Sequence, residues 1–190
     1  MGQKVFQFKI VLEEIKPLIW RRIQIADSCT FWNLHEAIQN SFPWTNSHLH
    51  CFEVLDPRFN ETEYFGFEDE ELGHRDGSKV KVKDYISLSN KKMRYEYDFG
   101  DSWQHLITLE KIVDKESGKK YPICLGGANA CPPEDVGGVC GYEHFLEVIA
   151  NPKDPEHEAF MTWGGRSFIP NYFDLKNVHF RRLSKGTDWI

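Results

Sequence analysis

Apolar and polar residues alternate along the first segment of the chain. In residues 5–12 apolar side chains recur at every second position, so they share one face of an extended backbone. Residues 18–25 repeat this alternation. Because only a short polar stretch around Pro17 separates the two segments, we expect an antiparallel pair of strands.

A helical period replaces the alternation after Thr30. Apolar residues recur every three or four positions from Phe31 to Phe42, Thr30 can cap the start, and Pro43 ends the pattern. Residues 48–55 return to the spacing of a strand. The opening of the chain therefore predicts the element order β-β-α-β.

Two further alternating segments, 92–99 and 103–112, flank turn residues at 100–102. Together they are the strongest hairpin signal in the chain. Residues 56–78 are acidic and irregular, and we expect only a short strand there, at 64–67.

The composition changes after residue 120. Residues 121–142 hold three of the five cysteines together with glycines and prolines, which predicts a constrained loop. Three helices are expected beyond it, at 142–149, 155–163 and 174–183. Strands first and helices last, without regular β-α alternation, predict an α+β fold with a mostly antiparallel sheet and C-terminal helices packed on it.

Composition supports a stable globular chain. It has 190 residues, 41% of them hydrophobic and 14% aromatic, so it can bury a core without metals or disulfides. We expect one domain over residues 1–190, with its core at about 4–183. No signal segment opens the chain and its apolar runs are too short to cross a bilayer, which predicts a cytoplasmic protein without a membrane partner. No C-x-x-C pair occurs, and free thiols are expected.

The net charge of −6 is unevenly distributed. Residues 61–76 carry seven acids and one base, and so do residues 121–160, a balance of −6 in each. Proteins that bind nucleic acid usually present a basic surface, because neutralising phosphates supplies most of the affinity. The charge therefore disfavours nucleic acid as a partner.

His48 and His50 are the first candidates for chemistry. On a strand, two residues at this spacing share a face, as metal sites on sheets often require. His105 could supply a third nitrogen and His35 a fourth, so a divalent metal is a possible cofactor. The alternative is that these are half-buried histidines hydrogen-bonded to backbone or carboxylate groups.

The hairpin turn carries a second set of candidates, Asp98 and Asp101. With His105 they could form an acid–base or ligand cluster near His48 and His50. Alternatively, their carboxylates bond turn amides and Gly100 supplies a positive φ. The Asp-Phe-Gly triplet does not indicate a kinase, since the sequence has no G-x-G-x-x-G loop and no H-R-D segment.

The loop at 130–138 is the third candidate. Pro132 and Pro133 stiffen its start, and glycines at its end permit unusual backbone, so Glu134 and Asp135 are held in a defined geometry. The alternative is a rigid surface loop with structural thiols. The Walker A, G-x-S-x-G and H-E-x-x-H templates do not occur in the sequence.

Four motifs follow one another along nearly the whole chain. They are P-L-I-W-R-R at 17–22, H-L-H at 48–50, Y-D-F-G-D-S-W at 97–103 and A-C-P-P-E-D at 130–135. Together they resemble the plasmid pRiA4b ORF-3-like family, with one departure at Val136, where members often have cysteine. The resemblance implies an α+β domain and carries no established activity. Some relatives bear labels linking them to transposon resolvases or to a repressor, which suggests an association with mobile elements.

The leading hypothesis is a binding module for an unknown protein or small-molecule ligand. It places a groove between Trp20, Arg22, Trp103 and the histidines, because aromatic and polar motifs gather there without a catalytic signature. A DNA transaction accessory protein is a third hypothesis, although the nucleophilic serine, arginine cluster and basic helix-turn-helix of a resolvase are not found in the sequence.

The alternative hypothesis is an enzyme, a metal-assisted hydrolase. In it His48, His50 and His105 bind a divalent metal, and Asp98 or Glu134 acts as the base.

Overall fold

The two opening strands pair with each other, as their alternation predicts. β1 (Lys4–Leu12) and β2 (Trp20–Ala26) run antiparallel, with Phe8 opposite Ile23 and Ile10 opposite Arg21. These four side chains are buried on one face of the pair. The structure, a computed structural model, describes residues 2–181.

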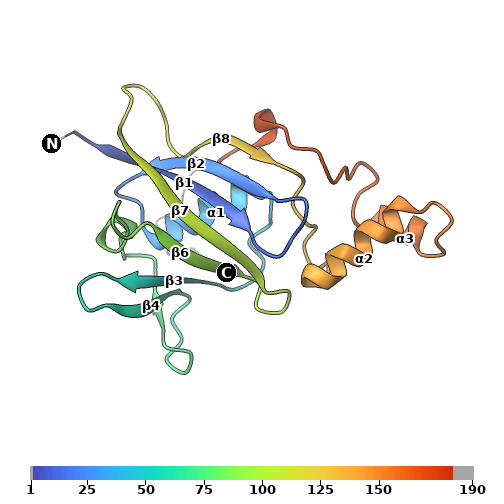
Figure 1. Ribbon diagram of the computed structural model, residues 1–190, viewed down its shortest axis with the longest axis horizontal. Helices are drawn as coiled ribbons and strands as arrows, with labels where there is room; N and C mark the ends of the chain where they lie inside the picture. Colours follow the sequence, from blue (N-terminus) through green and yellow to red (C-terminus); the bar gives the residue numbers. More distant parts are fainter. Residues whose placement is uncertain (1, 182–190) are drawn as a thin grey trace.

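Within residues 2–181, eight strands form one sheet in the order β5-β4-β3-β6-β7-β1-β2-β8 (Figure 1). The remaining strands are β3 (His50–Asp56), β4 (Glu61–Gly66), β5 (His74–Asp76), β6 (Lys92–Tyr97), β7 (Trp103–Asp114) and β8 (Ile123–Ala128). Every neighbouring pair is antiparallel except β4 and β5, which are parallel. The α+β class, the mostly antiparallel sheet and the β-β-α-β opening are confirmed.

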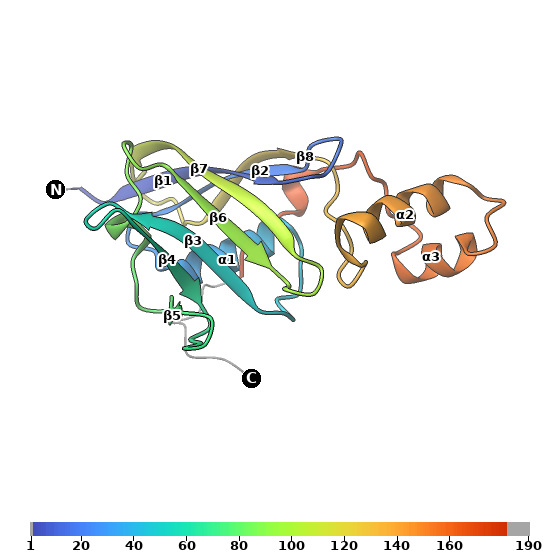
Figure 2. The same ribbon diagram turned by 60° about the horizontal axis from the view of Figure 1, so that its bottom comes forward.

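The helix α1 (Phe31–Ser41) lies against one face of the sheet and covers the main core (Figure 2). Its start is a capping box: the Thr30 hydroxyl accepts a hydrogen bond from the Asn33 amide, and the Asn33 side chain accepts one from the Thr30 amide. On its inner side Phe31 stacks on Phe65 of β4, with 4.5 Å between ring centroids. Apolar contact with the sheet therefore holds the helix in place.

A buried hydrogen-bond chain links α1 to β6. Gln39 donates to the Tyr95 hydroxyl at 3.1 Å, and the hydroxyl lies 2.8 Å from Nδ1 of His35. Nε2 of His35 lies 2.5 Å from the Asn46 side-chain oxygen, so Nε2 donates and Nδ1 accepts from Tyr95. Every polar side-chain group of the three buried residues in this hydrogen-bond chain, His35, Gln39 and Tyr95, has a partner, so they can be buried at little cost.

Two further histidines lie in the same core. The His50 ring stacks on His35 at 3.5 Å, and Nδ1 of His105 donates to the Trp103 carbonyl at 3.0 Å. Burial lowers the pKa of His35 to about 3 and that of His105 to about 4, and it holds the pKa of His50 well below the ordinary value. All three rings are therefore neutral at physiological pH.

β8 lies in the segment that the sequence predicts to be a loop. It pairs with β2 at the edge of the sheet. Gly126 and Gly127 interrupt any apolar alternation there, but Gly127 is required by the packing, because a Cβ would lie 2.7 Å from the Trp20 carbonyl oxygen. Gly127, one of the glycines that hide the strand in the sequence, is thus needed to form it.

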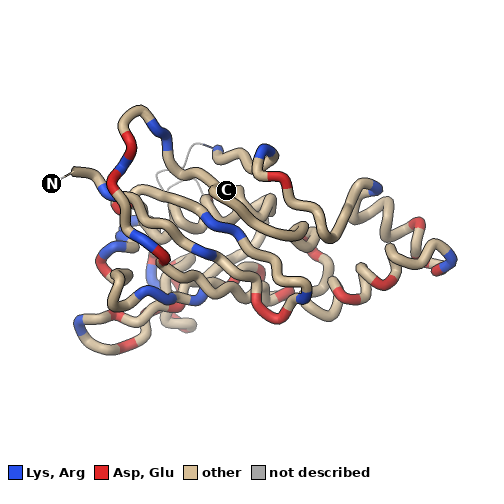
Figure 3. Tube along the Cα trace, turned by 45° about the horizontal axis from the view of Figure 1, so that its top comes forward, with Lys and Arg blue, Asp and Glu red and all other residues tan. Residues whose placement is uncertain are grey.

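The helices α2 (Gly138–Ala150) and α3 (His157–Trp163) pack against each other beyond one end of the sheet, not across its face (Figures 1 and 2). Phe145 of α2 contacts the rings of Phe160 and Trp163 and joins the core cluster of the sheet. Acidic residues outnumber basic ones along this pair (Figure 3). Among residues 2–181, no helix is long and apolar enough to cross a membrane.

The helix predicted at 174–183 is wrong over its described part. Asp174 does cap a start, since its carboxylate accepts from the Lys176 amide at 2.9 Å, but the turn Leu175–Asn177 is a single 3₁₀ turn. Val178 is already extended, and residues 182–183 lie outside the described part. Forming a first helical turn restricts several dihedral angles and gains few hydrogen bonds. Such a turn grows into a longer helix only where the helix can bury an apolar face.

Arg21 is the most deeply buried cation in the described chain. Its guanidinium donates to the carbonyls of Ser41, Trp20, Ala128 and Asn129, at 2.8, 2.8, 3.0 and 3.0 Å. No carboxylate among residues 2–181 forms an ion pair with it. Arg21 therefore joins the end of α1, strand β2 and the end of β8 through backbone acceptors alone.

Replacing Arg21 by methionine is expected to destabilise the protein by about 3 kcal/mol or more, because four carbonyls lose a donor, one of them buried and three part-buried. Arg22→Met is the matched control: Arg22 lies on the opposite, solvent-facing side of β2 and pairs with Glu110. Its loss should cost about 1 kcal/mol or less. Urea denaturation measures both, and equal costs would contradict the assigned role of Arg21.

Acid is expected to unfold the protein through its buried histidines. An unfolded histidine takes up a proton near pH 6.5, whereas the folded rings stay neutral until their lowered pKa values are reached. The contribution of these histidines to stability is therefore constant well above pH 6.5 and falls as the pH drops through that value. At pH 5 the unfolded chain holds about three more protons, a slope of about 4 kcal/mol per pH unit.

Urea denaturation between pH 7 and 4.5 measures this slope. His105→Gln, which keeps a donor for the Trp103 carbonyl, is expected to lower the proton uptake on unfolding by one. An uptake below one proton in the unsubstituted protein would show that the histidines do not control its acid stability.

Candidate functional site

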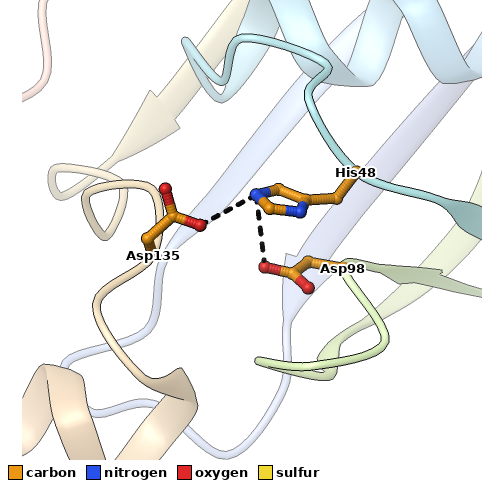
Figure 4. A group of neighbouring side chains, drawn as sticks. All are labelled: His48, Asp98 and Asp135. Carbon is orange, nitrogen blue, oxygen red and sulfur yellow. Dashed lines mark ion pairs between the residues drawn. The ribbon is translucent and has the colours of Figure 1, made fainter.

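Three segments far apart in the sequence meet at one end of the sheet. They are the residues leading into β3, the turn between β6 and β7, and the loop before α2 (Figure 4). The first brings His48, the second Asp98 and the third Asp135. All three segments carry candidates identified from the sequence, and the structure places those candidates together.

The His48 imidazole is surrounded by carboxylates. Its Nε2 lies 2.9 Å from Oδ1 of Asp135, 3.6 Å from Oδ2 of Asp98 and 4.0 Å from Oε2 of Glu134. The Asp98 side chain is 11% exposed and that of His48 29%, whereas that of Asp135 is 69% exposed. The cluster is thus closed on the protein side and open to solvent at Asp135.

The Asp98 carboxylate has two roles, because it stabilises the hairpin turn and also faces the imidazole of His48. Oδ1 accepts hydrogen bonds from the amides of Gly100 and Asp101, at 3.0 and 3.4 Å, and Oδ2 faces His48. The residue has φ +56°, a left-handed conformation that aspartate tolerates better than most residues. The turn hydrogen bonds therefore fix the direction in which the second oxygen points.

Glu134 is held at the rear of the cluster. Its Oε1 accepts from the Thr45 amide at 2.6 Å, from the Thr45 hydroxyl at 2.9 Å and from the Tyr97 hydroxyl at 3.1 Å. Burial and the nearby Glu134 charge raise the pKa of Tyr97, which keeps that hydroxyl a donor. Trp44 adds a bond from its indole nitrogen to the Pro132 carbonyl, so the loop is docked at several points.

Asp101 has a connecting role. Its Oδ2 accepts from the amide of Gly137, the residue that precedes α2, at 3.1 Å. The hairpin turn is thereby tied to the start of the helix. Its neighbour Asp98, and not Asp101, faces the imidazole of His48.

The structure does not bring His50 and His105 to His48. His48 precedes β3, whereas His50 lies on the strand and points into the core, where it stacks on His35. His105 is buried against Phe42 and Trp44. A metal site made of three histidines is therefore not formed, and only His48 of the predicted histidine set belongs to the cluster.

The groove expected between Trp20, Arg22 and Trp103 is not formed either. Trp20 and Arg22 lie on the face of the sheet opposite α1, where the Arg22 guanidinium is 5.1 Å from the Trp20 ring and pairs with Glu110. Trp103 is buried on the core face, with its ring 6.1 Å from Trp44. The sheet itself thus separates Trp103 from Trp20 and Arg22.

Two residues that matter here are not sequence candidates, Thr45 and Tyr97. Thr45 follows the turn after α1, where nothing in the spacing distinguishes it from a surface threonine. Tyr97 belongs to the apolar face of its strand, so the pattern predicts its burial but not the use of its hydroxyl. The available signals are its place at the start of the Y-D-F-G-D-S-W motif and its position as the last residue of β6, next to Asp98.

Among residues 2–181, His48, Asp98 and Asp135 form the group whose ligand atoms lie close enough to hold one metal ion, all within 4.8 Å of one another. One imidazole nitrogen and two carboxylate oxygens suit first-row divalent ions. Glu134 lies next to this group without belonging to it, and its carboxylate could accept a proton or a hydrogen bond there.

The fold and this loop-built cluster define a class of α+β domain in which an eight-stranded sheet carries one covering helix and a terminal helical pair. The chain belongs to the plasmid pRiA4b ORF-3-like protein family, whose model matches residues 4–177. The membership agrees with the resemblance carried by the four sequence motifs.

Two relatives extend this finding. The chain is 34% identical over 191 residues to the "Uncharacterized protein y4hQ" of Sinorhizobium fredii (strain NBRC 101917 / NGR234), covering 99% of this chain and 93% of that protein. It is similar to the crystal structure of MM3350, a protein of unknown function from Methanosarcina mazei Go1, with a TM-score of 0.89 and 43% identity over 95% of this chain and 100% of that one. The family and fold follow from these comparisons.

Proposed function

We propose that the protein is a ligand-binding module built around a divalent metal ion held by His48, Asp98 and Asp135. The observation that carries the proposal is the convergence of two carboxylates on one imidazole nitrogen from three separate segments. A hydrogen-bonded histidine needs only one such partner. The second carboxylate adds negative charge that a cation would balance.

The spacing of the ligand atoms supports one ion. Two ligands about 2.1 Å from a metal, at the angles of tetrahedral or octahedral geometry, are about 3.0–3.4 Å apart. The distances from Nε2 of His48 to the oxygens of Asp135 and Asp98 are 2.9 and 3.6 Å. Shifts of a few tenths of an ångström therefore suffice to bind an ion.

The open side of the cluster supports ligand binding at the metal. Three protein ligands leave at least one coordination position free, as in catalytic rather than structural metal sites. Asp135, the most exposed ligand, lies on that side. A small acceptor group such as a carboxylate or a phosphate could occupy the free position.

Hydrolysis is a second candidate function, favoured by the position of Glu134. Its Oε2 lies 4.0 Å from the imidazole nitrogen, and its other oxygen is fixed by Thr45 and Tyr97. A carboxylate next to a metal-bound water can accept its proton, which is the role of a general base. This replaces the three-histidine arrangement with one histidine and two aspartates.

Protein purified without a histidine tag is expected to bind one Zn²⁺ or Mn²⁺ ion per chain in isothermal titration. His48→Ala and Asp135→Asn should each weaken binding at least about 10-fold, since each removes a ligand. His144→Ala is the matched control, because His144 is an exposed histidine outside the cluster. Wild-type affinity in His48→Ala, or no stoichiometric uptake, would contradict the metal site.

The hydrolase is tested on metal-loaded protein with a panel of phosphate and carboxylate esters. Glu134→Gln is expected to lower the turnover rate at least about 100-fold while leaving metal affinity within a few-fold of the wild type. Activity that survives this substitution, or that survives removal of the metal by a chelator, would rule the mechanism out and leave the binding module unaffected.

A further inference from the structure

A hollow lies on the face of the sheet that α1 does not cover. Its volume is about 250 Å³ and it is half open to solvent. Its walls come from strands β3 to β7, and the residues that the argument uses are Cys51, Glu53, Tyr64, His74, Glu96 and Phe99. None of them belongs to the proposed metal site.

The strand register explains which side chains meet there. One row across the sheet runs from His74 through Tyr64 and Glu53 to Arg94. Directly opposite residues of neighbouring strands have Cβ atoms about 5 Å apart, so their side chains form a continuous wall. This row therefore places two rings and a carboxylate side by side.

The second row makes the hollow deep. It runs from Gly66 through Cys51 and Glu96 to Gln104. Gly66 has no side chain, and a Cβ there would lie 2.2 Å from the His50 carbonyl oxygen, so no other residue fits without a backbone shift. With the small Cys51 beside it, this row leaves a space that the first row does not fill.

Two loops overhang the space. Phe99, on the turn between β6 and β7, contacts His74 edge-on with 6.0 Å between ring centroids, and His74 stacks on Tyr64 at 6.0 Å. Leu72 extends from the loop between β4 and β5 and is 57% exposed. The entrance is thus aromatic and apolar, above a floor that carries carboxylates.

The charged side chains on the floor of the hollow differ in whether they have a partner. Arg94 is paired with Glu13, and Glu96 accepts a hydrogen bond from the Ser102 hydroxyl with one oxygen. The Glu53 carboxylate has no ion pair or hydrogen bond among residues 2–181. Burial is the main cause that raises the pKa of the Cys51 thiol to about 12, and the nearby Glu96 and Glu53 add to it.

We propose that this hollow binds an arginine or lysine side chain of a basic partner polypeptide. A cation is favoured by the free carboxylate of Glu53 and by the faces of Tyr64 and Phe99. The apolar rim fits the methylene stem that joins such a cation to its backbone.

A polypeptide, rather than a free amine, is favoured by the surroundings of the hollow. Residues 61–76, which include β4, β5 and their connecting loop, carry seven acids and one base. All seven acids lie outside the lining of the hollow, so a partner with further basic residues gains attraction that a single small cation cannot.

The test measures binding of a fluorescent nonapeptide with one central arginine flanked by two lysines, by anisotropy at low salt. Glu53→Gln and Tyr64→Ala are each expected to weaken binding at least about 5-fold. Both residues are exposed, so folding is not at risk. Glu143→Gln is the matched control, because Glu143 is an exposed acid on α2, outside the hollow and outside residues 61–76, and its loss should change affinity less than 2-fold.

Two further probes distinguish the alternatives. Citrulline in place of the arginine keeps the shape and removes the charge, and it is expected to weaken binding as much as Glu53→Gln does. Equal binding of the citrulline peptide, wild-type affinity in Glu53→Gln, or no peptide binding would overturn the proposal. Agmatine that binds as tightly as the peptide would overturn the assignment to a polypeptide. The metal titration is independent of every one of these results.

Discussion

The buried guanidinium of Arg21 is the contact on which the arrangement of the protein depends. A cation without a carboxylate partner is costly to bury, and here four backbone carbonyls and the rings of Phe42 and Phe173 balance it. Those carbonyls belong to the end of α1, to β2 and to the residues that follow β8, so a single side chain sets the position of all three. The chain that leaves β8 at Asn129 continues into the loop with Glu134 and Asp135. The geometry of the candidate metal site is therefore linked to the packing of a residue in the opening hairpin.

The two faces of the sheet differ in the kind of polar groups that they carry. α1 covers one face, and the ionisable rings beneath it are neutral: three histidines whose pKa values are lowered and a tyrosine in a closed hydrogen-bond chain. Apart from the buried Arg21, the charged groups of the two candidate sites lie at the end of the sheet and on the uncovered face. Because the residues of that hydrogen-bond chain satisfy one another, they contribute to the specificity of the fold, whereas the groups available for chemistry are those that loops and strand register leave with unbalanced charge.

Much of the fold could be predicted from the sequence, because alternation and helical spacing report directly on which face is buried. The opening strands, α1 with its Thr30 cap and the hairpin of β6 and β7 are of this kind. β8 could not be predicted, since Gly127 is required by contact with β2 and neither of its two glycines carries a periodic signal. For the site, the candidate motifs do converge, but His48 and His50 were expected to share a strand face. His48 precedes the strand, so the two-residue period does not apply to it, and the sequence alone shows no such boundary.

Asp98 and Asp135 both adopt left-handed backbone, with φ of +56° and +57°. Glycine would relieve this strain, and asparagine would tolerate it as well, so the backbone at neither position requires a carboxylate. Neutral side chains could therefore build the same two loops, and only carboxylates give them the negative charge that lies next to His48. In evolutionary terms, the shape and the charge of this corner of the molecule can change independently of each other.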